Sequence, residues 1–166
     1  ADGLVPLAVA ASAVPIIALS PLMGIWLGSI SPASKIAVVA VMTFFPTLVS
    51  VFRGLISPRA DALMLLHSYA TPERTVFLKL RAPAALPFFF SALRVCTTLS
   101  MIGAVVAGFF GGPQNALGVY IKTQAGILRT SEAWSAIIVA CLYGLAFYLA
   151  VVLVERAVMP WRREES

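Results

Sequence analysis

The chain has 166 residues, of which 60% are hydrophobic and only 11% are charged. This charged fraction is about half that of a typical soluble domain, which excludes an ordinary soluble protein and indicates a membrane protein. The net charge of +5 does not indicate a nucleic-acid partner, because the basic residues cluster in the segments between apolar stretches.

Long stretches without charge predict four membrane-spanning helices, because about 20 apolar residues cross a bilayer. We therefore expect an all-α, polytopic membrane helical bundle that forms a single domain over residues 1–166. A signal peptide is excluded for the first stretch, because no basic residue precedes Lys35. The first span could also continue as a broken helix to Leu27. The predicted spans are Leu4–Leu19, Lys35–Leu55, Ala84–Phe110 and Ala133–Val158.

The basic residues between these spans predict the orientation of the chain in the bilayer. Five lie between the second and third uncharged stretches, three lie near the C-terminus, and three lie in the connections expected on the opposite side of the membrane. Because cytoplasmic loops are enriched in Lys and Arg, the central segment and the C-terminus are expected in the cytoplasm. The two cytoplasmic groups are Arg53, Arg59, Arg74, Lys79 and Arg81, then Arg156, Arg162 and Arg163; the external residues are Lys35, Lys122 and Arg129.

The external connection Gly111–Glu132 is longer than a simple turn. Leu117, Tyr120, Ile121 and Leu128 recur at helical spacing, which predicts a short amphipathic helix near the outer mouth. A surface cap without a role in transport is the alternative.

The central cytoplasmic segment predicts a helix over Pro72–Leu80, preceded by an apolar, helix-compatible stretch from Asp61 to Tyr69. Thr71 is a good N-cap, Pro72 suits the first helical position, and Glu73 favours the positive end of the helix dipole. Pro83 is expected to end this helix. Its apolar residues Val76, Phe77 and Leu80 share one face, which predicts that the helix lies on the lipid surface or docks into a protein groove.

The same segment resembles the EAA loop of permease subunits in bacterial ATP-binding cassette (ABC) importers. That loop reads Glu-Ala-Ala, three residues, Gly, nine residues, Ile-x-Leu-Pro; here Met64, Leu65 and Leu66 are followed at the same spacing by Ala70 and by Leu80 to Pro83. Met64 and Ala70 therefore replace the usual Glu and Gly. The stretches FFPTLVSVFRGL, LRAPAALPFFFSALRV and LVERAVMPW are similar to the subgroup that imports nitrate, sulfonates, taurine, bicarbonate, and thiamine or riboflavin precursors.

The resemblance implies the type I ABC importer permease fold in a bacterial inner membrane. Two permease copies would form the translocation pathway, cytoplasmic ATPase subunits would drive it, and an extracytoplasmic binding protein would deliver the substrate. Because relatives have further N-terminal spans, we expect this chain to be destabilised or inactive alone. The coupling loop would cover about residues 57–83, and its coupling helix Tyr69–Phe77. Its contact residues would be Tyr69, Ala70, Thr71, Pro72, Glu73, Arg74, Val76, Phe77 and Leu80.

No phosphate-binding GxxxxGK[ST] motif, catalytic set or metal-ligand set occurs in the sequence. We therefore expect neither enzymatic activity nor a cofactor, with ATP hydrolysed by the partner subunit. An ion-gradient-driven secondary transporter is the alternative, but it would favour buried carboxylates, and every acid lies at a span end or in a loop. A membrane anchor for a cytoplasmic complex would not explain the polar third span.

Arg94 is the one charged residue between Ala82 and Ile121, and it lies about 12 Å deep if the third helix enters lipid near Leu86. It could snorkel to the cytoplasmic surface, contact an inner gate, or attract an anionic substrate. The candidate pathway residues on this helix are Ser91, Arg94, Thr97, Thr98 and Met101.

Overall fold

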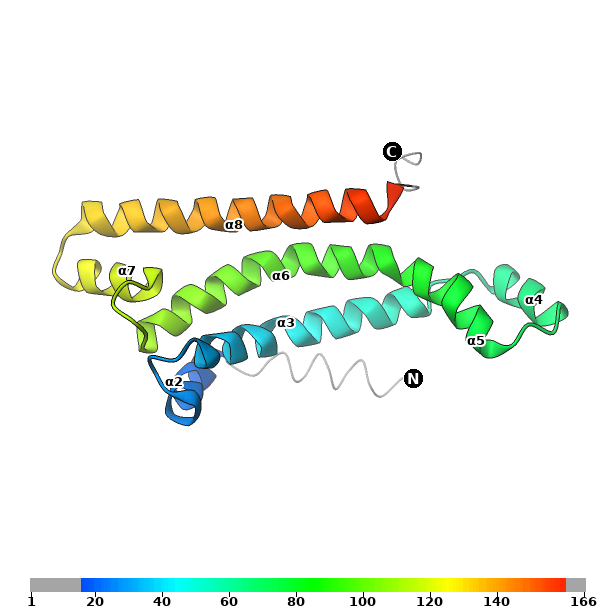
Figure 1. Cartoon of the computed structure of the whole chain (residues 1–166), viewed down its shortest axis with the longest axis horizontal. Helices are drawn as coiled ribbons and strands as arrows, with labels where there is room; N and C mark the ends of the chain where they lie inside the picture. Colours follow the sequence, from blue (N-terminus) through cyan, green and yellow to red (C-terminus); the bar gives the residue numbers. More distant parts are fainter. Residues whose placement is uncertain (1–15, 161–166) are drawn as a thin grey trace.

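The computed structural model describes residues 16–160, and every regular element in that range is helical. The predicted all-α class is therefore confirmed. In chain order, the elements of Figure 1 are α2 (Ile16–Leu27), α3 (Pro32–Leu55), α4 (Ala60–Ser68), α5 (Glu73–Val76), the π-helix η1 (Phe77–Arg81), α6 (Ala82–Phe110), α7 (Leu117–Gly126) and α8 (Thr130–Val158).

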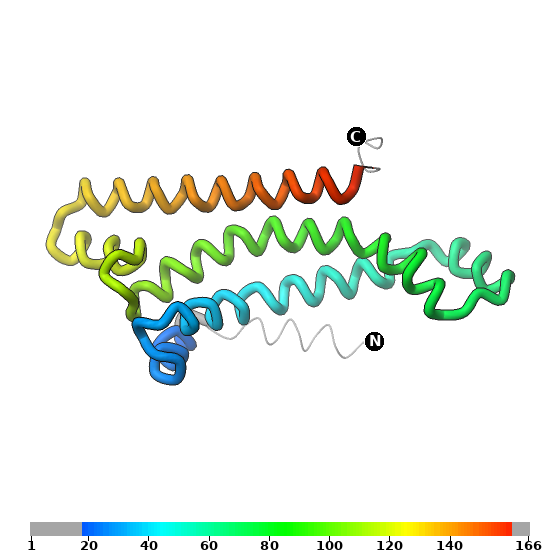
Figure 2. The backbone as a smooth tube through the Cα atoms, in the orientation of Figure 1, coloured from blue at the N-terminus to red at the C-terminus, as the bar shows by residue number. Residues whose placement is uncertain are grey.

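Three long helices, α3, α6 and α8, run side by side with α6 in the middle (Figures 1 and 2). Within residues 16–160 these are the helices long and apolar enough to cross a membrane. They confirm the second, third and fourth predicted spans, with starts two or three residues earlier than expected. The predicted first span, Leu4–Leu19, lies mostly outside the described residues. Its continuation is helical as α2, which passes Pro21 and ends at Leu27.

The α3–α6 pair forms the most extensive helix contact in the bundle, and glycine allows the two backbones to approach. A Cβ atom on Gly54 of α3 would lie only 2.8 Å from the Cα of Ala85 on α6. Toward the other end, Gly103 of α6 faces Met42 and Val39 of α3 in the same way. Small residues at helix interfaces let backbones approach in lipid, where little hydrophobic force drives helices together.

Polar side chains in the α3–α6 interface find partners across it. The hydroxyl of Ser50 donates to the carbonyl oxygen of Phe88 at 2.9 Å. Thr47 Oγ1 lies 3.2 Å from Cys96 Sγ. A polar group without a partner is costly in hydrocarbon, so these contacts fix the register of the two helices while satisfying their own hydrogen bonds.

The helix predicted over Pro72–Leu80 does not end before Pro83, which corrects the sequence-based expectation. α5, η1 and α6 form one continuous helix, Glu73–Phe110, of 38 residues. In an α-helix the ring of Pro83 would meet the carbonyl four residues earlier. The π-helix just before it widens the backbone, and the N–H of Ala82 bonds five residues back to the oxygen of Phe77. The chain therefore passes the proline without a break.

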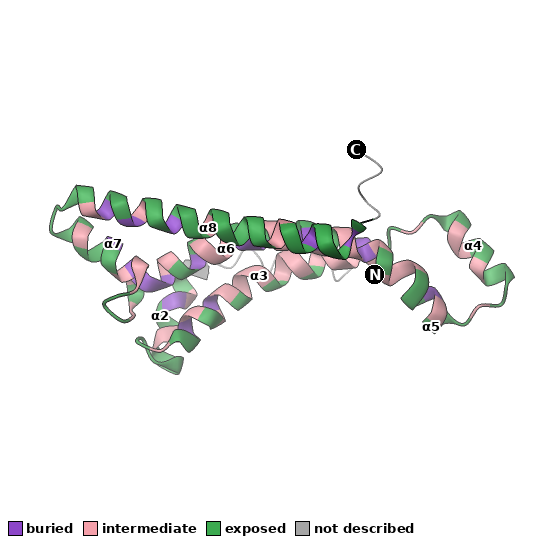
Figure 3. Ribbon diagram, turned by 45° about the horizontal axis from the view of Figure 1, so that its top comes forward, coloured by how far each residue is buried: buried purple, intermediate pink, exposed green. Residues whose placement is uncertain are grey.

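The two ends of the bundle carry different elements. α4 and α5 extend beyond the helices at one end, where α8 also ends, while α7 joins α6 to α8 at the other end (Figure 1). The short helix predicted in this connection is confirmed by α7, which ends at Gly126. Its predicted apolar face is not, because Ile121 is buried while Tyr120 is exposed and Leu128 lies exposed beyond the helix. Most of α8 is exposed along its length (Figure 3), although its residues are apolar. Such a surface is suited to lipid or to other membrane helices.

Candidate coupling segment and intramembrane site

A helical hairpin, residues 60–76, extends from the end of the bundle at which α3 and α8 finish (Figure 1). α4 ends in a Schellman motif: the N–H of Ala70 bonds the His67 oxygen at 2.9 Å, and the N–H of Thr71 bonds the Leu66 oxygen at 3.2 Å. Ala70 has φ 48°, a left-handed conformation that favours glycine. The EAA pattern has Gly at the position of Ala70, and the backbone conformation found there is one that favours glycine.

The second helix of the hairpin begins one residue later than predicted, and Thr71 is not its N-cap. Pro72 is the cap residue, with φ −63° and ψ 143° and no side-chain cap bond. Its carbonyl accepts hydrogen bonds from the N–H groups of Thr75 and Val76, at 2.8 and 3.2 Å. Because a residue before proline is biased toward extended conformations, Thr71 stays outside the helix. Residues Tyr69–Pro72 therefore form the turn of the hairpin and not part of a coupling helix.

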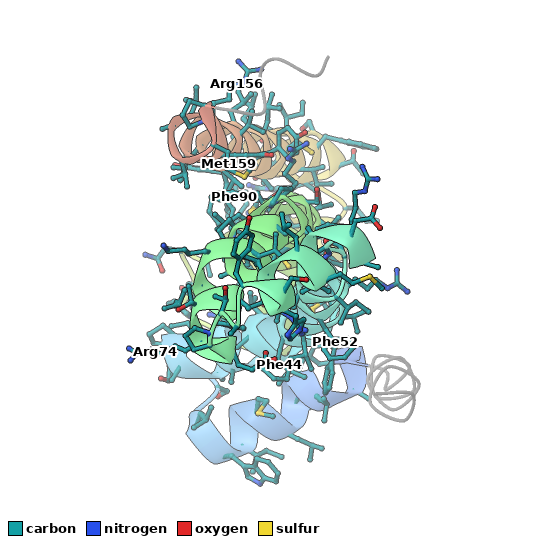
Figure 4. The ribbon with its side chains drawn as sticks, turned by 90° about the vertical axis from the view of Figure 1, so that its right-hand side faces the viewer. Phe44, Phe52, Arg74, Phe90, Arg156 and Met159 are labelled. Carbon is teal, nitrogen blue, oxygen red and sulfur yellow. The ribbon has the colours of Figure 1, made fainter. Side chains whose placement is uncertain are left out.

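The apolar side chains of the hairpin divide between the interior and the surface. Val76 is fully buried at 0% exposure, Leu80 is half-buried, and Phe77 is 47% exposed. The single apolar face predicted for these three residues is thus split. Figure 4 shows Arg74 pointing away from the bundle. The hairpin and the adjoining π-helix η1 present large exposed apolar side chains in a region rich in basic residues; these are Met64, Leu65, Tyr69, Phe77 and Leu78.

Deep in the bundle, Arg94 of α6 forms a two-pronged ion pair with Glu155 of α8. Arg94 Nε donates to Glu155 Oε2 at 2.8 Å, and the Nη2 group donates to Oε1. The Glu155 side chain is only 8% exposed and that of Arg94 is 36% exposed. Three explanations for Arg94 were open: snorkelling, a contact at an inner gate, and attraction of an anionic substrate. Its pairing with a carboxylate inside the protein favours the contact.

Glu155 was missed as a functional candidate because it lies at a span end. The signal that could have found it is charge matching. Arg94 needs an acidic partner inside the membrane, and Glu155 is the acid that directly follows the uncharged stretch of the last span.

The other pathway candidates on α6 point in different directions. Thr97 is buried and its hydroxyl donates to the Arg94 carbonyl at 2.7 Å, which occupies it within its own helix. Ser91 is exposed. Thr98 and Met101 line a cavity of about 470 Å³ between α6, α7 and α8. The remaining lining is apolar: Ile102, Val105, Val106, Ile121, Ile137, Ala140, Cys141 and Gly144.

The two groups of basic residues distinguished in the sequence lie at opposite ends of the bundle. The basic residues of the central segment and Arg156 lie at the hairpin end, while Lys35, Lys122 and Arg129 belong to elements at the α7 end. Lys122 Nζ also donates to the carbonyl oxygen of Phe109 at 2.7 Å, near the C-terminus of α6. A cation there is favourable, because this end of a helix is partially negative.

Comparison with known proteins assigns this fold to a family. Residues 2–164 match the family described as binding-protein-dependent transport system inner membrane component. The chain belongs to this family. Its fold is therefore that of a type I ABC importer permease, which confirms the resemblance of the EAA-like segment. The description of this family, binding-protein-dependent transport, is not that of an ion-gradient-driven transporter.

Curated relatives include permeases for several small nutrients. The chain is 31% identical to a formylaminopyrimidine transport permease of Halalkalibacterium halodurans over 96% of the chain and 63% of the relative. It is 29% identical to a riboflavin transport system permease of Chloroflexus aurantiacus, over 96% and 59%, and 26% identical to the taurine transport permease of Escherichia coli, over 91% and 54%. The chain thus spans roughly six-tenths of the length of these relatives. No solved structure matches.

Proposed function

We propose that this chain is the membrane-spanning subunit of an ABC importer, in which two copies enclose a substrate pathway and a separate ATPase supplies the energy. Family membership supports an inner-membrane, multi-pass transport protein. The observation that carries the coupling role is the continuity of the hairpin with a span: α5 is the first turn of the same 38-residue helix that crosses the membrane. A force applied to α5 therefore reaches the membrane interior without an intervening loop.

The hairpin is suited to a protein groove because it combines exposed apolar side chains with basic ones. Phe77 and Tyr69 supply large apolar contacts, and Arg74 adds a charge that points outward. Aromatic and Arg side chains are the residue types that dominate binding at protein interfaces. The ATPase would contact these residues and the turn at Ala70, and ATP-driven closure would tilt α6.

The coupling role is tested by replacing Phe77 with Asp and measuring ATP-driven uptake, ATPase activity and copurification of the ATPase. Ile127→Asp is the matched control, because Ile127 is also an exposed apolar residue but lies at the end of α7, at the opposite end of the bundle. We expect Phe77→Asp to remain inserted but to lose uptake and ATPase association, while Ile127→Asp retains both. Full uptake in the Phe77 variant would contradict the coupling role.

The orientation belongs to the same proposal, with the hairpin and the C-terminus in the cytoplasm. Single cysteines at Asn115, between α6 and α7, and at Ala60, the start of α4, test it in a background without Cys96 and Cys141; both positions are exposed. An impermeant thiol reagent should label Asn115→Cys in intact cells and leave Ala60→Cys unlabelled until the membrane is opened. The reverse pattern would place the hairpin outside, where it could not meet a cytoplasmic ATPase.

The substrate proposed is a small organic or anionic nutrient, such as a sulfonate, nitrate, a pyrimidine or a riboflavin precursor, delivered by an external binding protein. The named relatives transport formylaminopyrimidine, riboflavin and taurine, which supports this class. Of the pathway candidates, Thr98 and Met101 are the best supported, because they line the cavity. A cysteine at Thr98 should react with a water-soluble thiol reagent and be protected by substrate; Val95→Cys, on the exposed face of α6, is the control.

A further inference from the structure

The contact between α6 and α8 is uneven along its length. Near the α7 end, α8 packs through small buried residues, Ala133, Ala136 and Ala140. The middle is occupied by the cavity of about 470 Å³. At the hairpin end, the Arg94–Glu155 pair and the buried Met159 close the gap, and Figure 4 shows Met159 and Phe90 between the two helices.

The ion pair lies directly below the cavity. Arg94 is one helical turn from Thr98, which lines that cavity. The charged groups of α6 and α8 therefore meet between the hollow middle of the interface and the hairpin end.

A buried ion pair is not needed merely to hold two helices together. Apolar residues of similar volume often stabilise a protein as well or better, and the best-attested use of buried charges is to fix the register of helices. The fork of Arg matches a carboxylate only in a narrow geometry. A slip of α8 by one turn along α6 would move Glu155 about 5.4 Å and break both hydrogen bonds.

Arg94 lies on the same continuous helix as the coupling segment, so the register between α6 and α8 matters for transport. Arg94 is 17 residues after Phe77 on one continuous helix, or about 26 Å along the axis. A movement of the hairpin is transmitted along this helix to the level of the pair. From there it reaches α8 directly through the contacts between α6 and α8, or indirectly through α7, which packs against both helices. The cavity weakens the direct contacts in the middle of the bundle.

We propose that Glu155 is a positioning residue that acts through Arg94: its carboxylate fixes α8 to the helix carrying the coupling segment, so that α6 and α8 move as one body when the hairpin is displaced. This role rests on the proposed function, because it assumes that an ATPase moves the hairpin. The register itself is a property of the chain and can be measured without the ATPase.

The test measures the distance between spin labels at Val95 and Leu153, both exposed and close to the pair, with Cys96 and Cys141 replaced by Ser. Distances are recorded for the detergent-solubilised chain and for its complex with the ATPase, without nucleotide and after trapping with ADP and vanadate. We compare the labelled parent with Glu155→Gln, with the exchange Arg94→Glu plus Glu155→Arg, and with Glu132→Gln. Glu132 is the matched control, because it makes the same chemical change at the opposite end of α8.

The parent and Glu132→Gln should give one narrow distance that is the same in both nucleotide states. Glu155→Gln should add a second population displaced by up to one turn, about 5.4 Å, and the charge exchange should restore the single distance. If Glu155→Gln does not fold, Arg94→Gln plus Glu155→Gln takes its place, because this double variant leaves no unpaired buried charge.

A narrow, unchanged distance in the neutral variants would overturn the proposal, as would a charge exchange that folds but fails to restore the register. A parent whose two helices separate on trapping would also overturn it. Failure of the proposed function gives a different result: no ATPase would bind the parent, while the distances in the solubilised chain would still report whether Glu155 sets the register.

Discussion

The turn of the hairpin should become more stable when Ala70 is replaced by Gly. Ala70 occupies the left-handed region with φ 48°, which costs an L-residue roughly 1–2 kcal/mol. Glycine removes this cost but loses about 0.4–1 kcal/mol through the greater freedom of the unfolded chain. The net gain is about 0.5–1 kcal/mol, because the two Schellman hydrogen bonds are made by backbone groups that the substitution keeps.

Hydrogen exchange measured on a peptide covering the turn is the appropriate assay, because the hairpin extends beyond the bundle and can open locally. The Ala70→Gly variant should slow exchange of the Ala70 and Thr71 amides about 2- to 5-fold, the factor that corresponds to the expected free energy. Ala62→Gly is the matched control. It places the same substitution within α4, where glycine costs up to about 1 kcal/mol relative to alanine, and should speed exchange.

Faster exchange in the Ala70 variant, or changes of the same sign in both variants, would refute the argument from backbone strain. A functional readout completes the experiment. If the turn is part of the ATPase contact, Ala70→Gly should leave ATP-driven uptake intact or raise it, because the substitution introduces the glycine that the EAA pattern has at this position.

The other predictions concern glycines and a second strained turn. Leu128→Gly should slow exchange of the Leu128 and Arg129 amides about 2- to 5-fold, because Leu128 has φ 61° in the Schellman motif that ends α7. Gly118→Ala should lower the melting temperature in detergent, at a cost of about 1–3 kcal/mol, because its Cβ would collide with the Val105 carbonyl. Gly126→Ala, in the same helix with nothing within 4 Å, should be neutral or stabilising. Gly54→Val should separate α3 from α6 and destabilise the bundle, detected as loss of monodisperse protein in detergent.

The long helices could be predicted because charge is excluded from hydrocarbon, so uncharged stretches mark them almost regardless of packing. The second span ends at Leu55, the third at Phe110 and the fourth at Val158 in both sequence and structure. Helix α7 was predictable from helical spacing alone. The first span cannot be compared, because it falls mostly outside the described residues.

The hairpin shows where local rules stop being sufficient. Thr71 and Pro83 carry the usual signals for a helix start and stop, yet Pro72 caps the helix and η1 carries it past Pro83. A π-turn has no recognisable signature in a single sequence, because it depends on how the backbone adjusts around one residue. The sequence therefore predicted a separate short helix where the structure has the first turns of a membrane span.

The pairing of Arg94 with Glu155 also bears on how an anionic substrate would be recognised. A guanidinium next to a carboxylate has little net field at a distance, so it attracts a passing anion far less than an isolated cation would. The cavity above the pair is lined almost entirely by apolar side chains, with Thr98 as a polar exception. The relatives named above are permeases for formylaminopyrimidine, riboflavin and taurine. The neutralised charge of Arg94 is poorly placed to discriminate among substrates of this kind. The contact with Glu155 instead connects α6 to α8, so the observed partner of Arg94 is the other helix of the interface.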